Sequence, residues 1–204
     1  MTTQHGFNAL ALACACALLS ACAGMSGPGP AASTATVAPY RASIELAGRL
    51  SVNYDKGGQL ETLSGKFTWS QTPAAVDVAL LSPLGQTIAK IRVTPESASL
   101  TQSDNAPRVA RDIDSLTAQT LGWSLPVSGL RDWLQGYATG AGGTRFAASP
   151  ANNSVTTPDG WRLTFVSWQD ETAMKPVPKR IDAQRSASTA GGDLALRLIV
   201  DPPL

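Results

Sequence analysis

Apolar residues at every second position constrain the fold of this chain more than any other feature of its sequence. The first clear stretch runs from residue 46 to residue 54, where one face would carry Leu46, Gly48, Leu50, Val52 and Tyr54. The residues between them are Ala47, Arg49, Ser51 and Asn53. Successive side chains of a β-strand point to opposite faces, so this period of two predicts a strand with one apolar face.

The same period recurs along the rest of the chain. It is found at residues 66–70, 76–80, 89–93, 161–165 and 194–200. The last of these stretches follows Gly191, Gly192 and Asp193, which are turn-forming residues. Because each strand would be apolar on one side only, the pattern predicts an antiparallel sheet with one covered face.

Two intervals depart from this period and predict short helices. The first runs from about residue 114 to 121, with Asp114 as its N-cap and Gly122 as its stop. The second begins at Pro126, ends near Gly136 and places four apolar residues on one stripe: Val127, Leu130, Trp133 and Leu134. An apolar stripe must be buried, so we expect a curved sheet wrapped around these helices. Residues 138–158 read as loops, with 145–147 as a possible short strand.

The N-terminal segment predicts export and attachment to a lipid. Residues 7–21 form an apolar run too short to span a bilayer, and it ends in Leu19, Ser20, Ala21 and Cys22. This is the pattern of a bacterial lipoprotein signal peptide, which makes residues 1–21 removable and Cys22 the acylated first residue. Residues 23–39 carry no charge and are rich in Gly, Pro, Ser and Ala, so residues 22–39 read as a lipidated cysteine with a flexible tether. One domain is expected over residues 40–204.

The amino-acid composition excludes several kinds of catalytic and metal site. The only histidine is His5 and the cysteines are Cys14, Cys16 and Cys22, so cleavage before Cys22 leaves neither a histidine nor a free thiol. A Ser-His-Asp or Cys-His nucleophile, a thiolate or imidazole zinc site and a disulfide are therefore excluded. The net charge of +1 does not favour a nucleic-acid partner. We predict no cofactor, no metal and no catalytic residue.

The order of the remaining motifs resembles the LolB family of outer-membrane lipoprotein receptors, which are related in fold to the LolA carrier. The resemblance rests on the N-terminal cysteine motif and on Gly48-Arg49-Leu50, Gly65 to Trp69, Ser82-Pro83-Leu84-Gly85, Gly122 to Pro126, Leu130 to Gly136 and Gly160-Trp161. It implies an incomplete antiparallel β-barrel that encloses a hydrophobic cavity covered by short helices. The expected lining residues of this cavity are Leu50, Phe67, Trp69, Leu130 and Trp133.

The resemblance also implies a function without catalysis. The protein would accept lipoproteins from a LolA-type periplasmic carrier and insert them into the outer membrane without ATP. It would be anchored to the outer membrane, face the periplasm and act as a monomer, with acylated lipoproteins and outer-membrane lipids as its other partners. Burial is worth about 0.8 kcal/mol per methylene, so an acyl chain of about 15 methylenes needs an apolar shelter to cross water.

Pro83, Leu84 and Gly85 form the sharpest candidate site. Pro and Gly favour a turn between two predicted strands, which leaves two positions open for Leu84: folded back onto the sheet or projecting into solvent. The resemblance favours projection, because the matching leucine of the family protrudes and delivers cargo into the membrane.

Two other classes of function remain open at this point. One is a scaffold lipoprotein of the envelope, which would have a filled core. The other is a hydrolase that uses paired carboxylates, such as Asp112 with Asp114 or Asp170 with Glu171.

The predicted anchor can be tested by mass. The mature protein should begin at Cys22 and carry acyl chains, whereas Cys22→Ala behind a conventional signal peptide should yield a soluble domain that still folds, because the tether contributes no core. An unmodified Cys22, or a mature chain that begins at another residue, would contradict this prediction.

Overall fold

An open antiparallel sheet of ten strands is the centre of the structure. The computed structural model describes residues 31–102, 105–186 and 193–202; the predicted signal peptide, Cys22 and residues 23–30 of the tether lie outside these ranges. In sheet order the strands are β6 (Arg108–Ala110), β5 (Ala98–Gln102), β4 (Thr87–Val93), β3 (Val76–Leu81), β2 (Gln59–Gln71), β1 (Ile44–Lys56), β12 (Leu194–Val200), β11 (Pro178–Arg185), β10 (Arg162–Trp168) and β9 (Ser154–Thr156).

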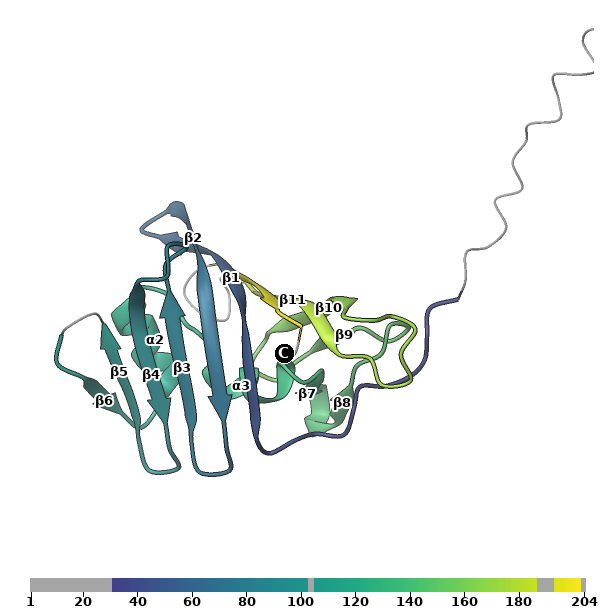
Figure 1. Ribbon diagram of the computed structural model, residues 1–204. Helices are drawn as coiled ribbons and strands as arrows, with labels where there is room; N and C mark the ends of the chain where they lie inside the picture. The colour runs from purple at the N-terminus through teal and green to yellow at the C-terminus, as the bar shows by residue number, and fades with distance from the viewer. Residues whose placement is uncertain (1–30, 103–104, 187–192, 203–204) are drawn as a thin grey trace, which may run out of the picture. The chain divides into compact units, whose positions relative to one another are not determined.

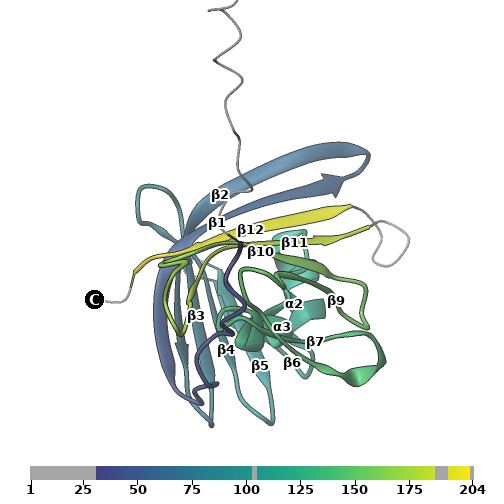
Figure 2. The same ribbon diagram turned by 90° about the vertical axis from the view of Figure 1, so that its right-hand side faces the viewer.

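The sheet is curved but not closed. Strands β6 and β9 stand at its two edges and do not pair with each other, so the prediction of an incomplete antiparallel barrel is confirmed. Figure 2 shows the sheet bending around the two helices of the described chain, α2 (Ile113–Leu121) and α3 (Val127–Trp133). A second sheet pairs β7 (Tyr137–Thr139) with β8 (Arg145–Ala147), and a short 3-10 helix (Ala141–Gly143) joins them. No helix of the described chain is long and apolar enough to cross a membrane.

The strand pairing explains the alternating pattern of the sequence. Along β1 the inner residues Leu50 and Val52 are 5% and 0% exposed, and they face the helices. On the neighbouring strand, Phe67 and Trp69 lie on the same inner face and are also buried. A shift of one residue would turn every apolar side chain outward, so the burial of this face fixes the register.

The helices begin and end close to their predicted positions, with two differences. Asp112, not Asp114, is the N-cap of α2, since its carboxylate accepts from the amides of Asp114 and Ser115. The prediction of Asp114 as the cap was therefore wrong by two residues. Gly122 ends α2 with a φ of 82°, as expected. Pro126 is the N-cap of α3 rather than its first helical residue, and α3 ends at Trp133 because the chain tightens into a turn before Gly136.

The segment before β1 lies against the body rather than extending from it. The amide of Val37 donates to the carbonyl oxygen of Ala148 over 3.0 Å, and the Tyr137 hydroxyl donates to the carbonyl oxygen of Ala38 over 2.7 Å. Val37 is 3% exposed and packs beside Gly136. The part of the predicted tether that the structure describes is thus fixed near β7 and β8.

Gly48 is the position at which the sheet tolerates least change. A Cβ on Gly48 would collide with the carbonyl oxygen of Ile199 in β12 and lie 2.8 Å from the ring of Phe67. We predict that Gly48→Ala lowers the free energy of unfolding by about 1–3 kcal/mol, because β12 or Phe67 must move. Ala47→Ser, on the exposed face of the same strand, should change it by less than about 0.5 kcal/mol. Chemical denaturation measures the free energy of unfolding of both variants, and an equal loss in the two would contradict the prediction.

Candidate functional site

The connection between β3 and β4 is a tight turn at residues 82–86. The Gly85 amide donates to the carbonyl oxygen of Ser82 over 2.8 Å, and the Ser82 amide donates to the carbonyl oxygen of Gln86 over 2.8 Å. Gly85 has a φ of 87°, which glycine adopts without the cost that a Cβ would bring. Pro83 and Leu84 occupy the two central positions, and the fixed φ of proline suits the first of them.

Leu84 projects from this turn into solvent. Its residue is 90% exposed, the largest exposed fraction of the large hydrophobic residues in the described chain. A leucine folded back onto the sheet would be buried, so the structure excludes that alternative. An exposed leucine forgoes roughly 1.5–3 kcal/mol of burial free energy.

An apolar cavity of about 120 Å³ lies between the sheet and the end of α2. Its lining comes from β1 to β5, from the last residue of α2 and from the segment that joins α2 to α3, and consists of Leu50, Leu63, Gly65, Leu80, Leu81, Ile88, Gln102, Leu121 and Trp123. Leu81 and Ile88 stand on either side of the 82–86 turn. The cavity therefore begins at the base of the turn that exposes Leu84.

The predicted lining residues are distributed unevenly around this cavity. Leu50 lines it. Phe67, Trp69 and Leu130 line, with Leu50, a much smaller void of about 10 Å³ beneath α3. Trp133 lines neither space and instead packs edge to face on Trp161, with ring centroids 5.7 Å apart. In this conformation Phe67, Trp69, Leu130 and Trp133 are core residues, and their contact with an acyl chain stays a prediction.

Sequence reasoning missed most of the cavity lining. Leu63 is half buried and continues the alternation of β2 three positions before its predicted stretch, whereas Leu81 and Ile88 are half buried but fall out of the alternation of β3 and β4, where the register shifts between Leu80 and Leu81. A period of two shows which face a residue lies on, and it does not show which part of that face the helices leave uncovered. The position of α2 decides that part.

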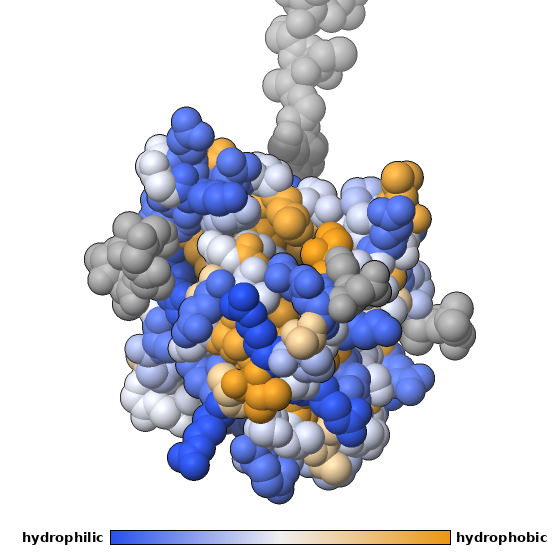
Figure 3. Space-filling model, turned by 90° about the vertical axis from the view of Figure 1, so that its left-hand side faces the viewer, coloured by the Kyte–Doolittle hydropathy of each residue, from blue (hydrophilic) through white to orange (hydrophobic). Residues whose placement is uncertain are grey.

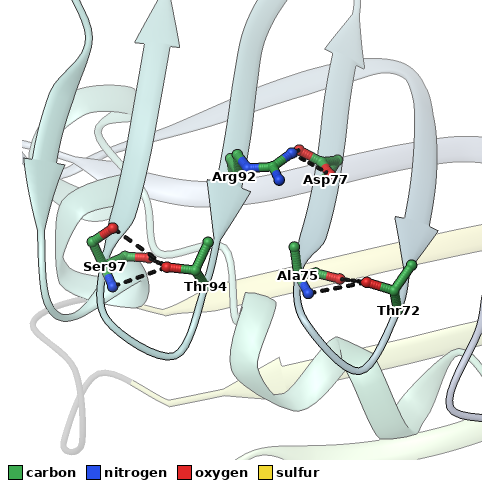
Figure 4. A network of polar contacts seen from close by, with 6 residues as sticks. All are labelled: Thr72, Ala75, Asp77, Arg92, Thr94 and Ser97. Atoms are coloured by element: carbon green, nitrogen blue, oxygen red, sulfur yellow. Dashed lines mark hydrogen bonds and ion pairs between the residues drawn. The ribbon is translucent and has the colours of Figure 1, made fainter.

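A hollow larger than the inner cavity lies on the opposite, outer face of the sheet. It measures about 900 Å³ and includes four charged side chains from β1, β3 and β4: Glu45, Asp77, Lys90 and Arg92. Figure 4 shows the Arg92 guanidinium donating to both carboxylate oxygens of Asp77, over 2.8 and 2.9 Å, above the Thr72–Ala75 and Thr94–Ser97 turns. An acyl chain placed here would lie against these ionic groups, so this face is poorly matched to hydrocarbon.

Apolar surface also reaches the exterior beside the helices. Figure 3 views the molecule from the side of β5, β6 and α2, and hydrophobic residues gather there in patches between polar ones. Val109 of β6 is 67% exposed on this edge strand. Val109 pairs with Ser99, whose side chain lines the outer hollow, so this apolar surface belongs to the outer face of the sheet.

Two polar contacts fasten α2 to α3. The Leu125 amide donates to the Thr117 hydroxyl over 3.0 Å, and the Ser128 hydroxyl donates to the Asp114 carboxylate over 2.5 Å. Burial raises the pKa of Asp114 above its usual value, the hydrogen bonds from Ser128 oppose this, and the charge of Asp112 adds to the rise. The two helices are therefore joined at their N-terminal ends and cover the sheet as one unit.

The carboxylates do not form a hydrolytic pair. Asp112 caps α2 while Asp114 binds Ser128, so the two carboxylates serve different helices. Asp170 lies in an exposed turn, where hydrogen bonds from Thr172 lower its pKa. Among the described residues, no three His, Cys, Asp or Glu side chains gather as a metal site requires. Cys22 lies outside the described residues.

Comparison with known proteins identifies the family. The model of the family described as outer membrane lipoprotein LolB matches residues 42–202. This chain belongs to the LolB family. An outer-membrane lipoprotein LolB from Cupriavidus necator is 39% identical, over 82% of this chain and 88% of its own length. Another LolB, from Cupriavidus pinatubonensis, is 36% identical, over 99% of this chain and 98% of its own length. A LolA superfamily protein from Nitrosomonas europaea has a TM-score of 0.43 at 9% identity, over 82% of this chain and 90% of its own.

Membership confirms several of the predictions made from the sequence. The confirmed predictions are the resemblance to LolB, the mainly β fold and a role in lipoprotein localisation that is not enzymatic. The chain is an outer-membrane lipoprotein of this family. Membership alone does not assign the roles of Cys22, Pro83, Leu84 and Gly85.

Proposed function

We propose that lipoproteins pass through this protein along the apolar space between the sheet and the α2–α3 unit, and leave it at the β3–β4 turn. The LolB family to which the chain belongs receives lipoproteins from LolA for insertion into the outer membrane. What requires a proposal is the route that the acyl chains take in this molecule. One copy suffices for that route, because the turn and the cavity lie on the same chain.

The observation that carries this proposal is the contact between an exposed apolar turn and an apolar cavity. Leu84 stands in solvent, and Leu81 and Ile88, which lie one and two residues outside its turn, line the cavity. An acyl chain that leaves the cavity at this end has only the short 82–87 segment to pass before it reaches the apolar tip. A short path matters, because each methylene left in water would cost about 0.8 kcal/mol.

The cavity must widen when cargo binds. A cavity of about 150 Å³ accommodates a ligand the size of benzene, so the observed 120 Å³ admits only a segment of one acyl chain. The sheet is held by a continuous ladder of backbone hydrogen bonds, whereas α2 and α3 rest on it through side chains such as Leu116, Leu125 and Leu130. We propose that the α2–α3 unit moves outward to admit the chains, since its two helices are already joined to each other.

The anchor completes the proposed arrangement. Acylation of Cys22 would hold the protein on the outer membrane with its body in the periplasm, and outer-membrane lipids would be the receiving partner. The segment from Ser33 to Pro39 lies on the body near β7 and β8, so the free tether would extend only from Cys22 to about Ala32. About ten residues span at most about 36 Å, which limits how far Ala32 could stand from the membrane surface.

The proposal predicts that Leu84 is needed for delivery and not for uptake. Leu84→Glu should fold normally, because the side chain is exposed, and it should still accept lipoprotein from the LolA carrier. Transfer from the loaded protein to liposomes should fall at least about tenfold, since a carboxylate in hydrocarbon costs several kcal/mol. The measurement is cargo recovered with the liposomes after incubation.

Leu84→Ile is the matched control, because it keeps the apolar character of the tip and should retain most of the delivery. Delivery by Leu84→Glu at the wild-type rate would overturn the proposed exit. If the folded protein accepted no lipoprotein at all, a scaffold role in the envelope would become the better account.

A further inference from the structure

A second exposed leucine lies at the same end of the sheet as Leu84. Strands β1 to β4 run alternately up and down, so the β1–β2 and β3–β4 turns lie at one end and the β2–β3 and β4–β5 turns at the other (Figure 1). Leu60, next to the β1–β2 turn, is 73% exposed. Two hairpins therefore present a large apolar side chain in the same direction along the sheet.

The β1–β2 hairpin extends beyond its neighbours. Strand β2 pairs with β3 only as far as Lys66 with Leu81, and β1 pairs with β12 only as far as Tyr54 with Leu194. Among the described residues, residues 55–60 thus pair only with each other, and Figure 1 shows their hairpin rising above the strands beside it. The Gly58 amide donates to the Asp55 carboxylate over 3.0 Å, which keeps the tip ordered.

Both tips are free of contact with the rest of the described chain. A Cβ placed on Gly57, Gly58 or Gly85 would meet no heavy atom within 4 Å. The two exposed leucines consequently have room around them for an external partner. Between the two hairpins lie Leu63, Leu81 and Ile88, which line the cavity at their base.

The charges at these tips indicate what kind of partner fits. Residues 82–87 carry no charge, and residues 54–61 carry one Lys against one Asp and one Glu. A partner recognised through charge, such as an acidic protein or a strongly anionic lipid surface, would need a basic patch that is absent from these two segments. The apolar layer of a bilayer needs only the leucines.

We propose that the β1–β2 hairpin is a second membrane-contact element, in which Leu60 enters the bilayer beside Leu84. This inference rests on the proposed function, since it takes the β3–β4 turn as the delivery site. A single inserted side chain leaves the body free to rotate about it. Two inserted side chains leave only rotation about the line that joins them, which restricts the body to orientations that hold the sheet end with the cavity residues near the lipid.

A fluorescent probe beside Leu60 tests this contact directly. In the full acylated chain the thiol of Cys22 is blocked, so Gln59→Cys supplies a single site for an environment-sensitive dye. In vesicles of neutral phospholipid, we expect its emission to rise and to be quenched by a quencher attached to the lipid acyl chains. Glu96→Cys, in the β4–β5 turn at the opposite end of the sheet, is the control and should stay in water. A probe at residue 59 that behaves like the probe at residue 96 would overturn the inference.

Delivery assays separate this inference from the proposal on which it rests. Leu60→Glu should accept cargo normally and lower delivery to neutral vesicles several-fold, with little dependence on salt. Met174→Glu is the matched control: Met174 is 87% exposed and lies between β10 and β11, near the end of the sheet where β12 finishes, so delivery should be unchanged. If Leu84→Glu blocks delivery while Leu60→Glu does not, the second contact fails and the exit at Leu84 stands. If both variants deliver normally, the exit at Leu84 and the second contact at Leu60 are both contradicted.

Discussion

The burial of one apolar face of an open sheet is the constraint on which the rest of this structure depends. Ten strands pair edge to edge without closing, so the inner face must be covered by something other than the sheet itself. The α2–α3 unit supplies that cover, with Leu125 and Leu130 packed over Leu50 and Trp69. A closed barrel would hold its interior by backbone hydrogen bonds on every side, whereas this cover is held by side-chain packing and can move without breaking the sheet. A protein that takes up and releases acyl chains needs a cover that can move while the sheet stays intact.

The sequence predicted the sheet well because one-sided burial imposes a period that does not depend on distant residues. Strands β1, β2, β3, β4, β10 and β12 were all predicted, and so were the helices and the short strand β8. Strand β11 was not predicted, because Lys179, Arg180 and Arg185 leave it without a clear apolar alternation in the sequence. In the structure the Arg180 guanidinium pairs with Asp182, and the Arg185 guanidinium lies 4.6 Å from the centroid of the Trp161 ring. Long basic side chains can lie along a strand when a carboxylate or an aromatic face receives them.

The candidate site was predicted in part. The turn at Pro83 and Gly85 follows from local turn chemistry, but the exposure of Leu84 depends on whether any other element reaches it, and the residues alone left that open. The cavity shows the same limit, since Leu50 was expected to line it while Leu63, Leu121 and Trp123 were not. These residues meet because α2 ends at Gly122 and the chain returns under the sheet through Trp123 and Leu125. Such a meeting is a property of the packed helices and has no signature within any one segment.

The central claim is that cargo acyl chains occupy the inner, apolar side of the sheet and not the larger hollow on its outer side. The most direct measurement is photo-crosslinking from a lipoprotein whose acyl chain carries a diazirine near its end, followed by mass spectrometry of the labelled peptides. The account predicts labels on residues around the inner cavity, such as Leu63, Leu121 and Trp123. Labels on Thr68, Ala79 and Thr101, which line the outer hollow, would contradict it.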